Sequence, residues 1–370
     1  MEIKISKQEL AKKLQHVQSI VDRKTTMPIL SNVLLTTQNK KLWLSATDLE
    51  VGMSISAEAD VLTEGKITID ARSFYDVVRE LPDDVIHFSV KENNRIELKC
   101  GRSEFKIMGL AADEFPALPK KGEGNTFAFP CAAVVQMMEK AAFAMSTDEA
   151  RYNLNGVLLE QHKNESATFL RMVATDGHRL SVVDREMKGG WQLPKAVIVP
   201  RKGIAELKRL IENQDGSFDL WIDEKHAIAF VGDVTLYVRL IDGQFPPYSQ
   251  VVPKKSKRVI VVPRKELLSG LRRVSSMANE RSKGVRFRFS PKHLEISSSN
   301  PDRGEAREEL SIDYRGEAFD VGFNARYFLD ALSLIEDEQA VLELGEDTAP
   351  CVLRSELDKG FTHVIMPMRL

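Results

Sequence analysis

Apolar residues recur at helical spacing near the start of each third of the chain. Leu10, Leu14, Val17 and Val21 lie four, three and four residues apart, so they share one face of a helix. The same spacing recurs in the sets Val134, Met138, Ala141, Met145 and Leu267, Leu271, Val274, Ala278. Residues that favour a helix start precede the three stripes, namely Ser6, Pro130 and Pro263. The pattern predicts three equivalent amphipathic helices.

A second amphipathic helix is predicted at a similar distance after each first helix. The first apolar residues of the two stripes are 64, 70 and 61 residues apart in the three thirds of the chain. The second stripes are Phe74, Val77, Leu81; Ile204, Leu207, Ile211; and Phe328, Ala331, Ile335. The chain therefore reads as three copies of one unit.

Between the helices, polar and apolar residues alternate with a period of two, which is typical of strands with one buried face. The alternation is clearest in residues 41–44, 66–70, 97–107, 220–230, 285–289 and 341–344. Short turns between consecutive strands favour antiparallel pairing. We therefore expect an α+β fold of three repeated domains, each with two helices packed on antiparallel sheet.

Two Phe-Pro pairs, at residues 115–116 and 245–246, mark candidate exits from the repeats. Proline cannot continue a strand ladder, so each pair predicts a passage from a sheet into a linker. The predicted domains are residues 1–124, 125–253 and 254–370. We expect no such exit in the third copy, because the sequence stops after Val-Ile-Met-Pro-Met-Arg-Leu at residues 364–370.

Composition narrows the class of protein without identifying it. The 52 basic and 54 acidic residues give a net charge of −2, and 43% of the residues are apolar, enough for an ordinary core. The N-terminal residues do not resemble a secretory signal, and no apolar run approaches the ~18 residues of a membrane span. Cys100, Cys131 and Cys351 are too far apart for a paired metal site, and their odd number argues against a disulfide framework. We expect a cytoplasmic protein.

Basic charge is concentrated on two of the predicted helices. Residues 6–24 carry five basic and two acidic side chains, and residues 263–283 carry six basic and two acidic ones. Solvated helix surfaces and a phosphate-binding face both fit this pattern. No helix-turn-helix, zinc-finger or RNP signature is present, so contact with DNA is expected to ignore base sequence. A regulator with a sequence preference is the alternative.

Residues 171–183 combine two strand-like runs with a polar centre. Asp176-Gly177 predicts a turn that brings Thr175, His178 and Arg179 to one sheet edge, with Leu180 beside them. The cluster fits an ordinary hairpin turn or an acid–base pair of Asp176 and His178. The chain contains no phosphate-binding loop, dinucleotide motif, nucleophile elbow or zinc-protease motif. We therefore expect no catalytic residues, no cofactor and no metal.

Several motifs in order carry a resemblance over the whole chain. They are Met-Pro-Ile-Leu at 27–30, Thr-Asp-Leu-Glu at 47–50, Arg-Tyr at 151–152, Leu-Asn-Gly at 154–156, Thr-Asp-Gly-His-Arg-Leu at 175–180, Val-Pro-Arg-Lys-Gly at 199–203, Gly-Phe-Asn at 322–324 and Met-Pro-Met-Arg-Leu at 366–370. The chain resembles the bacterial DNA polymerase III β subunit, the β sliding clamp. The resemblance implies a non-catalytic head-to-tail homodimer whose six domains close a ring around duplex DNA.

The resemblance also implies partners and sites. The polymerase III catalytic subunit, the clamp loader, and other polymerases and repair proteins would bind one peptide groove, with no membrane contact. The groove residues would be Leu154, Thr175, Gly177, His178, Arg179, Leu180, Pro246, Val251, Asn324, Tyr327, Val364, Met366, Pro367, Met368 and Arg369. Methionines would give an adaptable apolar floor, and His178 and Arg179 would hold a polar or main-chain group at the rim. Gln250 and Pro350 depart from residues common in relatives.

Two further contact surfaces follow from the same resemblance. The DNA-facing residues would be Lys24, Arg72, Tyr152, Arg201 and Lys202, while Asn153 departs from a second aromatic. The dimer interface would place Phe105 and Ile107 against Ser276 and Met277, with Arg102 opposite Glu308. In that interface Glu104 would face the acidic Glu305, and Ser73 opposite Asp302 lacks a usual lysine. We therefore expect a dimer held less by ion pairs than in many relatives, and easier to open.

Overall fold

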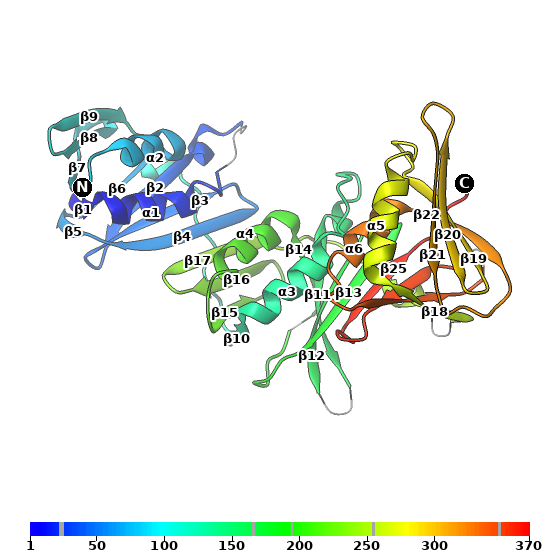
Figure 1. The fold of residues 1–370 in the computed structure, drawn as a ribbon. Coiled ribbons are helices and arrows are strands. Elements are labelled where there is room, and N and C mark those ends of the chain that lie inside the picture. Colours follow the sequence, from blue (N-terminus) through cyan, green and yellow to red (C-terminus); the bar gives the residue numbers. More distant parts are fainter. Residues whose placement is uncertain (22–25, 165–166, 194, 254–255, 347–348) are drawn as a thin grey trace. The chain divides into compact units, whose positions relative to one another are not determined.

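The chain folds into two compact units, one formed by Met1–Cys131 with Ala205–Leu240 and the other by Ala132–Ile204 with Ile241–Leu370 (Figure 1). The computed structural model describes residues 1–21, 26–164, 167–193, 195–253, 256–346 and 349–370. Each unit is described by itself. None of the helices in the described ranges is long and apolar enough to cross a membrane.

The first unit contains two antiparallel sheets. The five-stranded sheet has the order β5(Asp60–Thr63), β1(Glu2–Ser6), β7(Val85–Val90), β8(Arg95–Cys100), β9(Ser103–Met108). The eight-stranded sheet has the order β10(Phe127–Pro130), β15(Ser217–Ile222), β16(His226–Val231), β17(Val234–Arg239), β4(Val51–Glu58), β3(Lys41–Thr47), β2(Asn32–Gln38), β6(Lys66–Asp70). The helical segments are α1(Lys7–Val17), α2(Ala71–Glu80), η1(Pro28–Ser31), η2(Glu92–Asn94) and η3(Ala112–Glu114). Helices α1 and α2 pack against each other, and α1 lies on β3 and β4.

The second unit also has two antiparallel sheets. The larger has the order β14(Val197–Pro200), β11(Gly156–Lys163), β12(Thr168–Thr175), β13(Arg179–Glu186), β25(Phe361–Ile365), β24(Cys351–Arg354), β23(Gln339–Leu344), β18(Arg258–Pro263). The smaller has the order β21(Gly304–Ser311), β20(His293–Asn300), β19(Gly284–Ser290), β22(Phe319–Asn324). The helical segments are α3(Cys131–Ala142), α4(Arg201–Ile211), α5(Arg264–Ser275), α6(Ala325–Leu332), η4(Tyr152–Leu154) and η5(Tyr248–Gln250), where α3 begins and α4 ends in the first unit.

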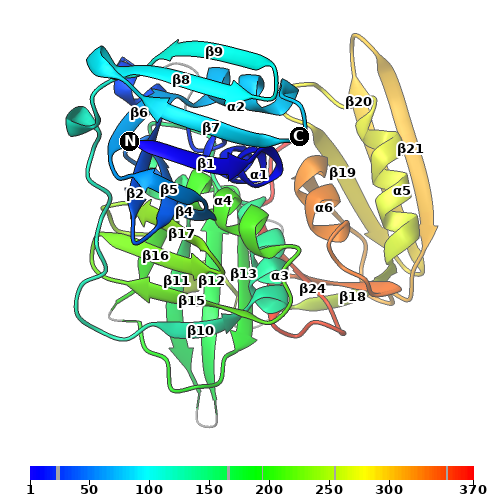
Figure 2. The same ribbon diagram turned by 90° about the vertical axis from the view of Figure 1, so that its left-hand side faces the viewer.

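Helices α5 and α6 lie on one face of the smaller sheet (Figure 2). Val285, Phe287 and Phe289 alternate along β19 and are fully buried on that face, because the period of two points them to one side. Phe287 packs against Phe328 of α6, with ring centroids 5.0 Å apart. The opposite face of β19 carries the polar residues of the strand.

The helical periodicity is confirmed in all three thirds of the chain. The four apolar positions of each first stripe are buried, and Ser6 caps α1 by accepting a hydrogen bond from the Glu9 amide at 3.2 Å. Pro130 and Pro263 are the last residues of strands β10 and β18, directly before their helices. One stripe position is wrong: Val78 of α2, not Val77, is fully buried beside Phe74. The helices are also shorter than the stripes, because the last stripe residues of five helices are buried after the helix has ended: Val21, Leu81, Met145, Ala278 and Ile335.

Two of the predicted strands are in fact hairpins. Residues 97–107 contain β8 and β9, joined by a turn at Gly101, whose φ is 55°. Residues 220–230 contain parts of β15 and β16. The sequence marks both turns: the apolar positions change from Leu98 and Cys100 to Phe105 and Ile107 across the first, and residues 223–226 are a polar run at the second.

The eight-stranded sheets join strands from neighbouring copies. Strand β4 of the first copy pairs with β17 of the second, and β13 of the second pairs with β25 of the third. Each sheet therefore continues across a predicted domain boundary. The boundaries near residues 124 and 253 stay a prediction.

Candidate functional site

The turn between β12 and β13 is built by its own polar side chains. Gly177 has a φ of 88°, a conformation that glycine adopts without strain. The Thr175 hydroxyl accepts from the Gly177 amide at 3.0 Å and donates to the Arg179 carbonyl at 2.5 Å. The Asp176 carboxylate accepts from the amides of His178 and Arg179 at 2.9 and 3.0 Å. The turn is therefore fixed, and His178 is exposed at its tip.

Arg179 is buried rather than presented at a rim. Its guanidinium group bonds to the Asp176 carboxylate at 3.0 Å, the Asp330 carboxylate at 2.6 Å and the Phe143 carbonyl at 2.6 Å. It lies over the rings of Phe143 and Tyr327, 5.2 and 4.8 Å from their centroids. Only 7% of the residue is exposed. All three of its nitrogens bond within the chain, and a contact of Arg179 with a bound peptide stays a prediction.

The Asp176 carboxylate is likewise engaged in structure. One of its oxygens holds the two amides of the turn and the other holds Arg179. These contacts support the ordinary hairpin rather than an acid–base pair of Asp176 with His178.

An apolar cluster lies beneath the turn. Seven of its eight buried residues come from six strands of the larger sheet, and the eighth is Ile241: Leu158, Val173, Leu180, Val182, Ile198, Ile241, Val352 and Val364. Phe245, Tyr248 and Val252, from the segment that follows Ile241, pack against it and are partly buried. The candidate residues Leu180 and Val364 belong to this floor. Leu154 and Thr175 are buried as well, whereas Gly177, Pro246 and Val251 are exposed.

A hydrogen-bond network fixes the segment that carries Pro246 and Val251. The Tyr248 hydroxyl donates to the Glu160 carboxylate and accepts from Arg171 at 3.2 Å. Arg171 in turn binds Asp184 with two hydrogen bonds of 2.6 and 2.7 Å. Burial and the bond to Glu160 raise the pKa of Tyr248 to about 12. The neutral hydroxyl therefore persists at physiological pH and ties the segment to β11 and β12.

The C-terminal segment, residues 366–370, follows β25 directly past the turn (Figure 1). In the register of the two strands Leu180 pairs with Val364, and the Met366 amide then donates to the His178 carbonyl at 2.9 Å. Met366 is 36% exposed, Pro367 and Met368 are half-buried, and Arg369 is exposed. Asn324 caps α6 by accepting from the Arg326 amide at 2.9 Å. The turn and the C-terminal segment thus meet over the apolar cluster.

Sequence reasoning missed several residues that shape this site. Phe143, Tyr248 and Asp330 lie far from the turn in sequence, and no local pattern marked them. Arg171 lies near the turn, but its bonds to Asp184 and Tyr248 were not predicted. His363 of β25 was also missed: it is fully buried, 5.1 Å from the Phe143 ring. Burial, assisted by Arg179, lowers the pKa of His363 to about 3.

Two of the candidate DNA-facing residues, Arg201 and Tyr152, lie in the second unit. Arg201 donates to the carbonyls of Met145 and Ser146 at 3.2 and 2.9 Å, and its amide bonds to the Asn155 carbonyl just after η4. Tyr152, in η4, is 54% exposed.

The remaining candidates are placed separately. Lys202 follows Arg201 on α4, and Arg72 lies on α2 in the first unit. Lys24 lies outside the described residues. Asn153, where a second aromatic was expected, donates to the Gln244 carbonyl at 2.9 Å, so it anchors the segment after Ile241.

The candidate dimer-interface residues lie on or near edge strands. β9 is the edge of its sheet and exposes Arg102 beside it and Phe105 on it, with Ile107 half-buried. β21 is the edge of the smaller sheet of the second unit and carries Glu308. Glu308 already binds Arg273 of α5 at 2.7 and 2.9 Å, which lowers the pKa of its carboxyl group. Ser276 and Met277 follow α5, and Met277 lies near Gly304.

Comparison with known proteins agrees with this arrangement along the whole chain. Family models of the DNA polymerase III beta subunit match residues 1–119 with the N-terminal domain, 129–247 with the central domain and 249–369 with the C-terminal domain. The beta sliding clamps of Pseudomonas putida and Pseudomonas aeruginosa are 35% and 36% identical, with 100% of both chains covered.

Solved structures give the same result. The Caulobacter crescentus pol III beta structure superposes with a TM-score of 0.96 at 35% identity over 100% of both chains. A Pseudomonas aeruginosa sliding clamp bound to griselimycin gives a TM-score of 0.92 at 35% identity, again over 100% of both chains. Matched in all three domains and over its full length, the chain belongs to the DNA polymerase III beta subunit family, the non-catalytic beta sliding clamps of bacterial DNA replication.

Proposed function

We propose that two copies of this chain close head to tail into a ring around duplex DNA in the cytoplasm, and that the surface between the β12–β13 turn and the C-terminal segment is the groove that captures client peptides. The observation that carries the groove is the bond from the Met366 amide to the His178 carbonyl, which holds these two segments together over an apolar cluster. The proposed clients are the polymerase III catalytic subunit, the clamp loader, and other polymerases and repair proteins.

The chemistry of the groove suits short peptides. Met366 and Met368 provide flexible apolar contacts that adapt to different side chains. Pro246, Val251 and His178 stand exposed around the buried floor of Leu180 and Val364. Arg179 and Asp176 hold the turn through their polar atoms, so Arg179 supports the groove from within the chain. A polymerase that binds to a ring enclosing DNA has a raised local concentration at the DNA. A weak contact between polymerase and ring therefore suffices for processive synthesis.

DNA is held by enclosure rather than by tight binding. Each neutralised phosphate adds salt-dependent affinity, which would slow sliding. The proposed DNA-facing residues are Lys24, Arg72, Tyr152, Arg201 and Lys202, a small number for a DNA-binding protein. The Arg201 guanidinium already donates hydrogen bonds to the carbonyls of Met145 and Ser146. These bonds support a weak rather than a strong contact of Arg201 with DNA phosphates.

The dimer contact is proposed between strands β9 and β21 of different copies. Both are edge strands with backbone groups available for pairing. Phe105 and Ile107 on β9 would supply apolar contact to Ser276 and Met277 near β21. Glu104 lies 3.7 Å from Lys99, and Glu305 accepts from Ser299 at 3.1 Å, so the repulsion expected between the two acids is reduced within each chain.

Retention on DNA of different topology tests the ring. The protein is loaded with a clamp loader onto nicked circular DNA, which is then cut once. A ring is retained on the circle and lost from the linear form. A protein that stays bound after cutting is a conventional DNA-binding regulator, and the ring proposal fails.

The groove is tested separately by measuring the affinity of a labelled peptide from the polymerase III catalytic subunit. Deletion of residues 366–370 is expected to abolish peptide binding and leave the mass of the dimer unchanged. Wild-type affinity after this deletion would place the groove elsewhere.

A further inference from the structure

The three copies share one backbone contact at the point where the chain leaves each repeat. In the first copy Leu110 and Thr68 exchange hydrogen bonds of 2.9 and 3.1 Å. In the second copy the Ile241 amide donates to the Ile198 carbonyl at 2.9 Å. Thr68 and Ile198 each lie three residues before the first residue of the second helix of their copy, α2 and α4.

The third copy has the same contact, made by the C-terminal segment. The Met368 amide donates to the Gly322 carbonyl at 2.8 Å, and Gly322 lies three residues before α6 begins at Ala325. The C-terminal segment therefore occupies the position that Leu110 and Ile241 occupy in the first two copies, although no Phe-Pro pair follows it in the sequence given.

Only the third copy has glycine at this position, and space explains the difference. A Cβ atom on Gly322 would lie 2.5 Å from the Met368 carbonyl oxygen and 2.7 Å from Leu370 Cγ. A Cβ atom on Gly284, in the adjacent strand β19, would lie 2.5 Å from Leu370 Cδ2. Thr68 and Ile198 make the shared contact with side chains present, so the hydrogen bond itself does not demand glycine.

We propose that Gly284 and Gly322 form a glycine seat, that is, two neighbouring positions without side chains on which the C-terminal segment packs. The seat fixes how closely this segment approaches strands β19 and β22 and which of its residues bonds to Gly322. It thereby positions Met366 at the peptide groove. This inference rests on the proposed peptide-binding function. Only Pro367 separates Met366, bonded to His178, from Met368, bonded to Gly322. A shift at the seat is therefore transmitted to the groove, and both glycines are positioning residues.

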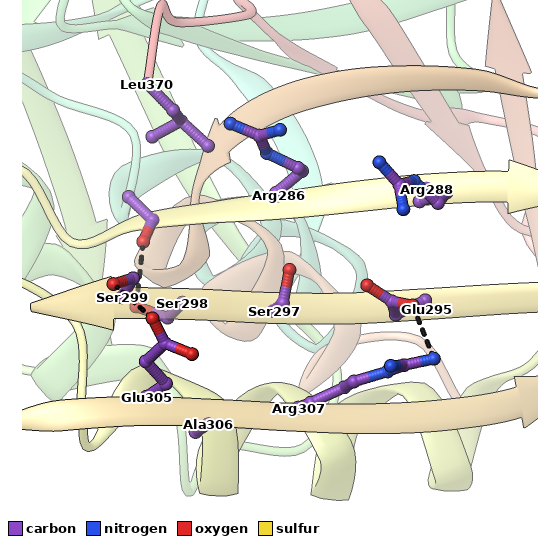
Figure 3. A pocket seen from close by; sticks show the side chains of 11 residues that line it. Arg286, Arg288, Glu295, Ser297, Ser298, Ser299, Glu305, Ala306, Arg307 and Leu370 are labelled. Atoms are coloured by element: carbon purple, nitrogen blue, oxygen red, sulfur yellow. Dashed lines mark hydrogen bonds and ion pairs between the residues drawn. The ribbon is translucent and has the colours of Figure 1, made fainter.

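The surroundings of the seat fix where Leu370 can lie. Figure 3 shows Leu370 at one end of a cavity of about 550 Å³ that extends along β19, β20 and β21. Arg286 and Arg288 rise from the same face of β19 as Gly284, and Arg288 binds Asp320 at 3.0 Å. The two glycines thus leave a position without side chains at the edge of a sheet face that otherwise carries large charged side chains. Leu370 is 55% exposed, so its position is fixed by contact with Gly284 and Gly322 rather than by burial in a core.

The test uses the full-length protein and two readouts. The affinity of the labelled peptide from the polymerase III catalytic subunit reports on the groove, and hydrogen exchange of the Met366 and Met368 amides reports on the C-terminal segment. Gly322→Ala and Gly284→Ala are each expected to weaken peptide binding by about tenfold and to speed exchange at both amides. The reason is that the added methyl group displaces the C-terminal segment from the sheet. The dimer mass and the thermal unfolding midpoint serve as folding controls.

A second substitution separates the two glycines. Leu370→Ala removes the side chain that a Cβ atom on Gly284 would meet, so it is expected to restore peptide affinity to Gly284→Ala. It is not expected to restore Gly322→Ala, because the nearest obstruction there is the Met368 backbone oxygen. Leu370→Ala alone controls for loss of any direct peptide contact.

The outcomes distinguish this inference from the proposed function. If deletion of residues 366–370 abolishes binding while both glycine variants keep wild-type affinity, the groove stands and the seat is wrong. If the variants speed amide exchange without weakening binding, the transmission to Met366 is wrong. If the deletion itself leaves binding intact, the groove proposal fails first.

Discussion

The ammonium group of Lys13 on α1 donates a hydrogen bond to the Asp233 carboxylate in the turn between β16 and β17, although 220 residues separate them in the sequence. Lys13 is 7% exposed, and α1 belongs to the first copy while the turn belongs to the second. Burial by itself would lower the pKa of Lys13, but the hydrogen bonds and negative charges of Asp233 and Glu9 together raise it. Ser19 and Glu206 add a hydrogen bond of 3.0 Å between the same copies.

We predict that Lys13→Ala lowers the free energy of unfolding by about 1–2 kcal/mol, because it removes a charge-assisted hydrogen bond and leaves Asp233 without this partner. Urea unfolding followed by circular dichroism measures the change. Lys12→Ala, at an exposed position on the same helix, is the control and should have little effect. Equal effects of both substitutions would show that the bond contributes nothing.

Arg179 and His178 are expected to behave differently although they are adjacent. Arg179→Ala leaves Asp330 and the Phe143 carbonyl without their partner, so it should lower the free energy of unfolding by about 2–4 kcal/mol. His178→Ala changes an exposed side chain and should weaken peptide binding without changing stability. Thermal unfolding together with peptide affinity separates the two roles. A stable Arg179→Ala protein with intact peptide binding would contradict the buried role of Arg179.

Tyr248→Phe tests the network that fixes the groove wall. The ring keeps its packing on the apolar cluster, but the bonds to Glu160 and Arg171 are lost. We expect about 1 kcal/mol less stability and weaker peptide binding, because Pro246 and Val251 are held less firmly. Calorimetric titration with the polymerase peptide measures this. Tyr75→Phe on α2, in the first unit, should leave peptide binding unchanged.

His363 predicts a loss of stability in mild acid. Its pKa is about 3 in the folded protein, below the ordinary value of 6.5, so the unfolded chain takes up this proton first. The stability is complete above pH 6.5 and falls by about 1.4 kcal/mol per pH unit as the pH drops toward 3. The pKa values of Asp337 and Asp358 are lowered, so the stability that these two carboxylates contribute to the protein is lost only below about pH 4.

Urea unfolding at pH 7 and at pH 5 isolates the histidine contribution. His16 has a lowered pKa from burial and from Arg209 and contributes in the same direction, so the comparison is made between wild type and His363→Leu. The variant should lose less stability than wild type between the two pH values. An identical loss in both proteins would mean that His363 accepts its proton without unfolding.

The dimer is predicted to open at nanomolar concentration with little dependence on salt. Glu308, the expected partner of Arg102 across the interface, is already bound to Arg273 of its own chain. The contact then depends mainly on apolar packing and backbone pairing, and Phe105→Ala should weaken it further. Fluorescence-detected sedimentation at two salt concentrations measures the dissociation constant. A dimer that stays intact at nanomolar concentration, or one that salt disrupts strongly, would contradict this view.

Local sequence signals predicted local features well. The spacing of Leu10, Leu14 and Val17 identified α1, because the helical period of apolar residues is a local property of the sequence. Asp176-Gly177 identified the β12–β13 turn for the same reason. The choice of Val77 over Val78 failed because both fit a helical stripe, and tertiary packing decided between them. The motifs that carried the family resemblance also predicted which segments meet at the site.

Features made by distant residues were out of reach of the sequence. The partner of Arg179 is Asp330, 151 residues away, and nothing near either residue indicates the pair. An exposed rim arginine and a buried one have the same local sequence, so the burial of Arg179 was not predicted. The glycine seat was missed because Gly284 and Gly322 have ordinary strand conformations, and only contact with Leu370 and Met368 explains them.

The pairing of β4 with β17 and of β13 with β25 has a mechanical consequence. Each junction between consecutive repeats is crossed by a ladder of five residue pairs, so prying repeats of one chain apart would require breaking main-chain hydrogen bonds. The contact proposed between β9 and β21 of separate chains has no covalent continuity. A protein that opens the ring to admit duplex DNA is therefore expected to separate that interface. The junctions within each subunit are expected to stay rigid.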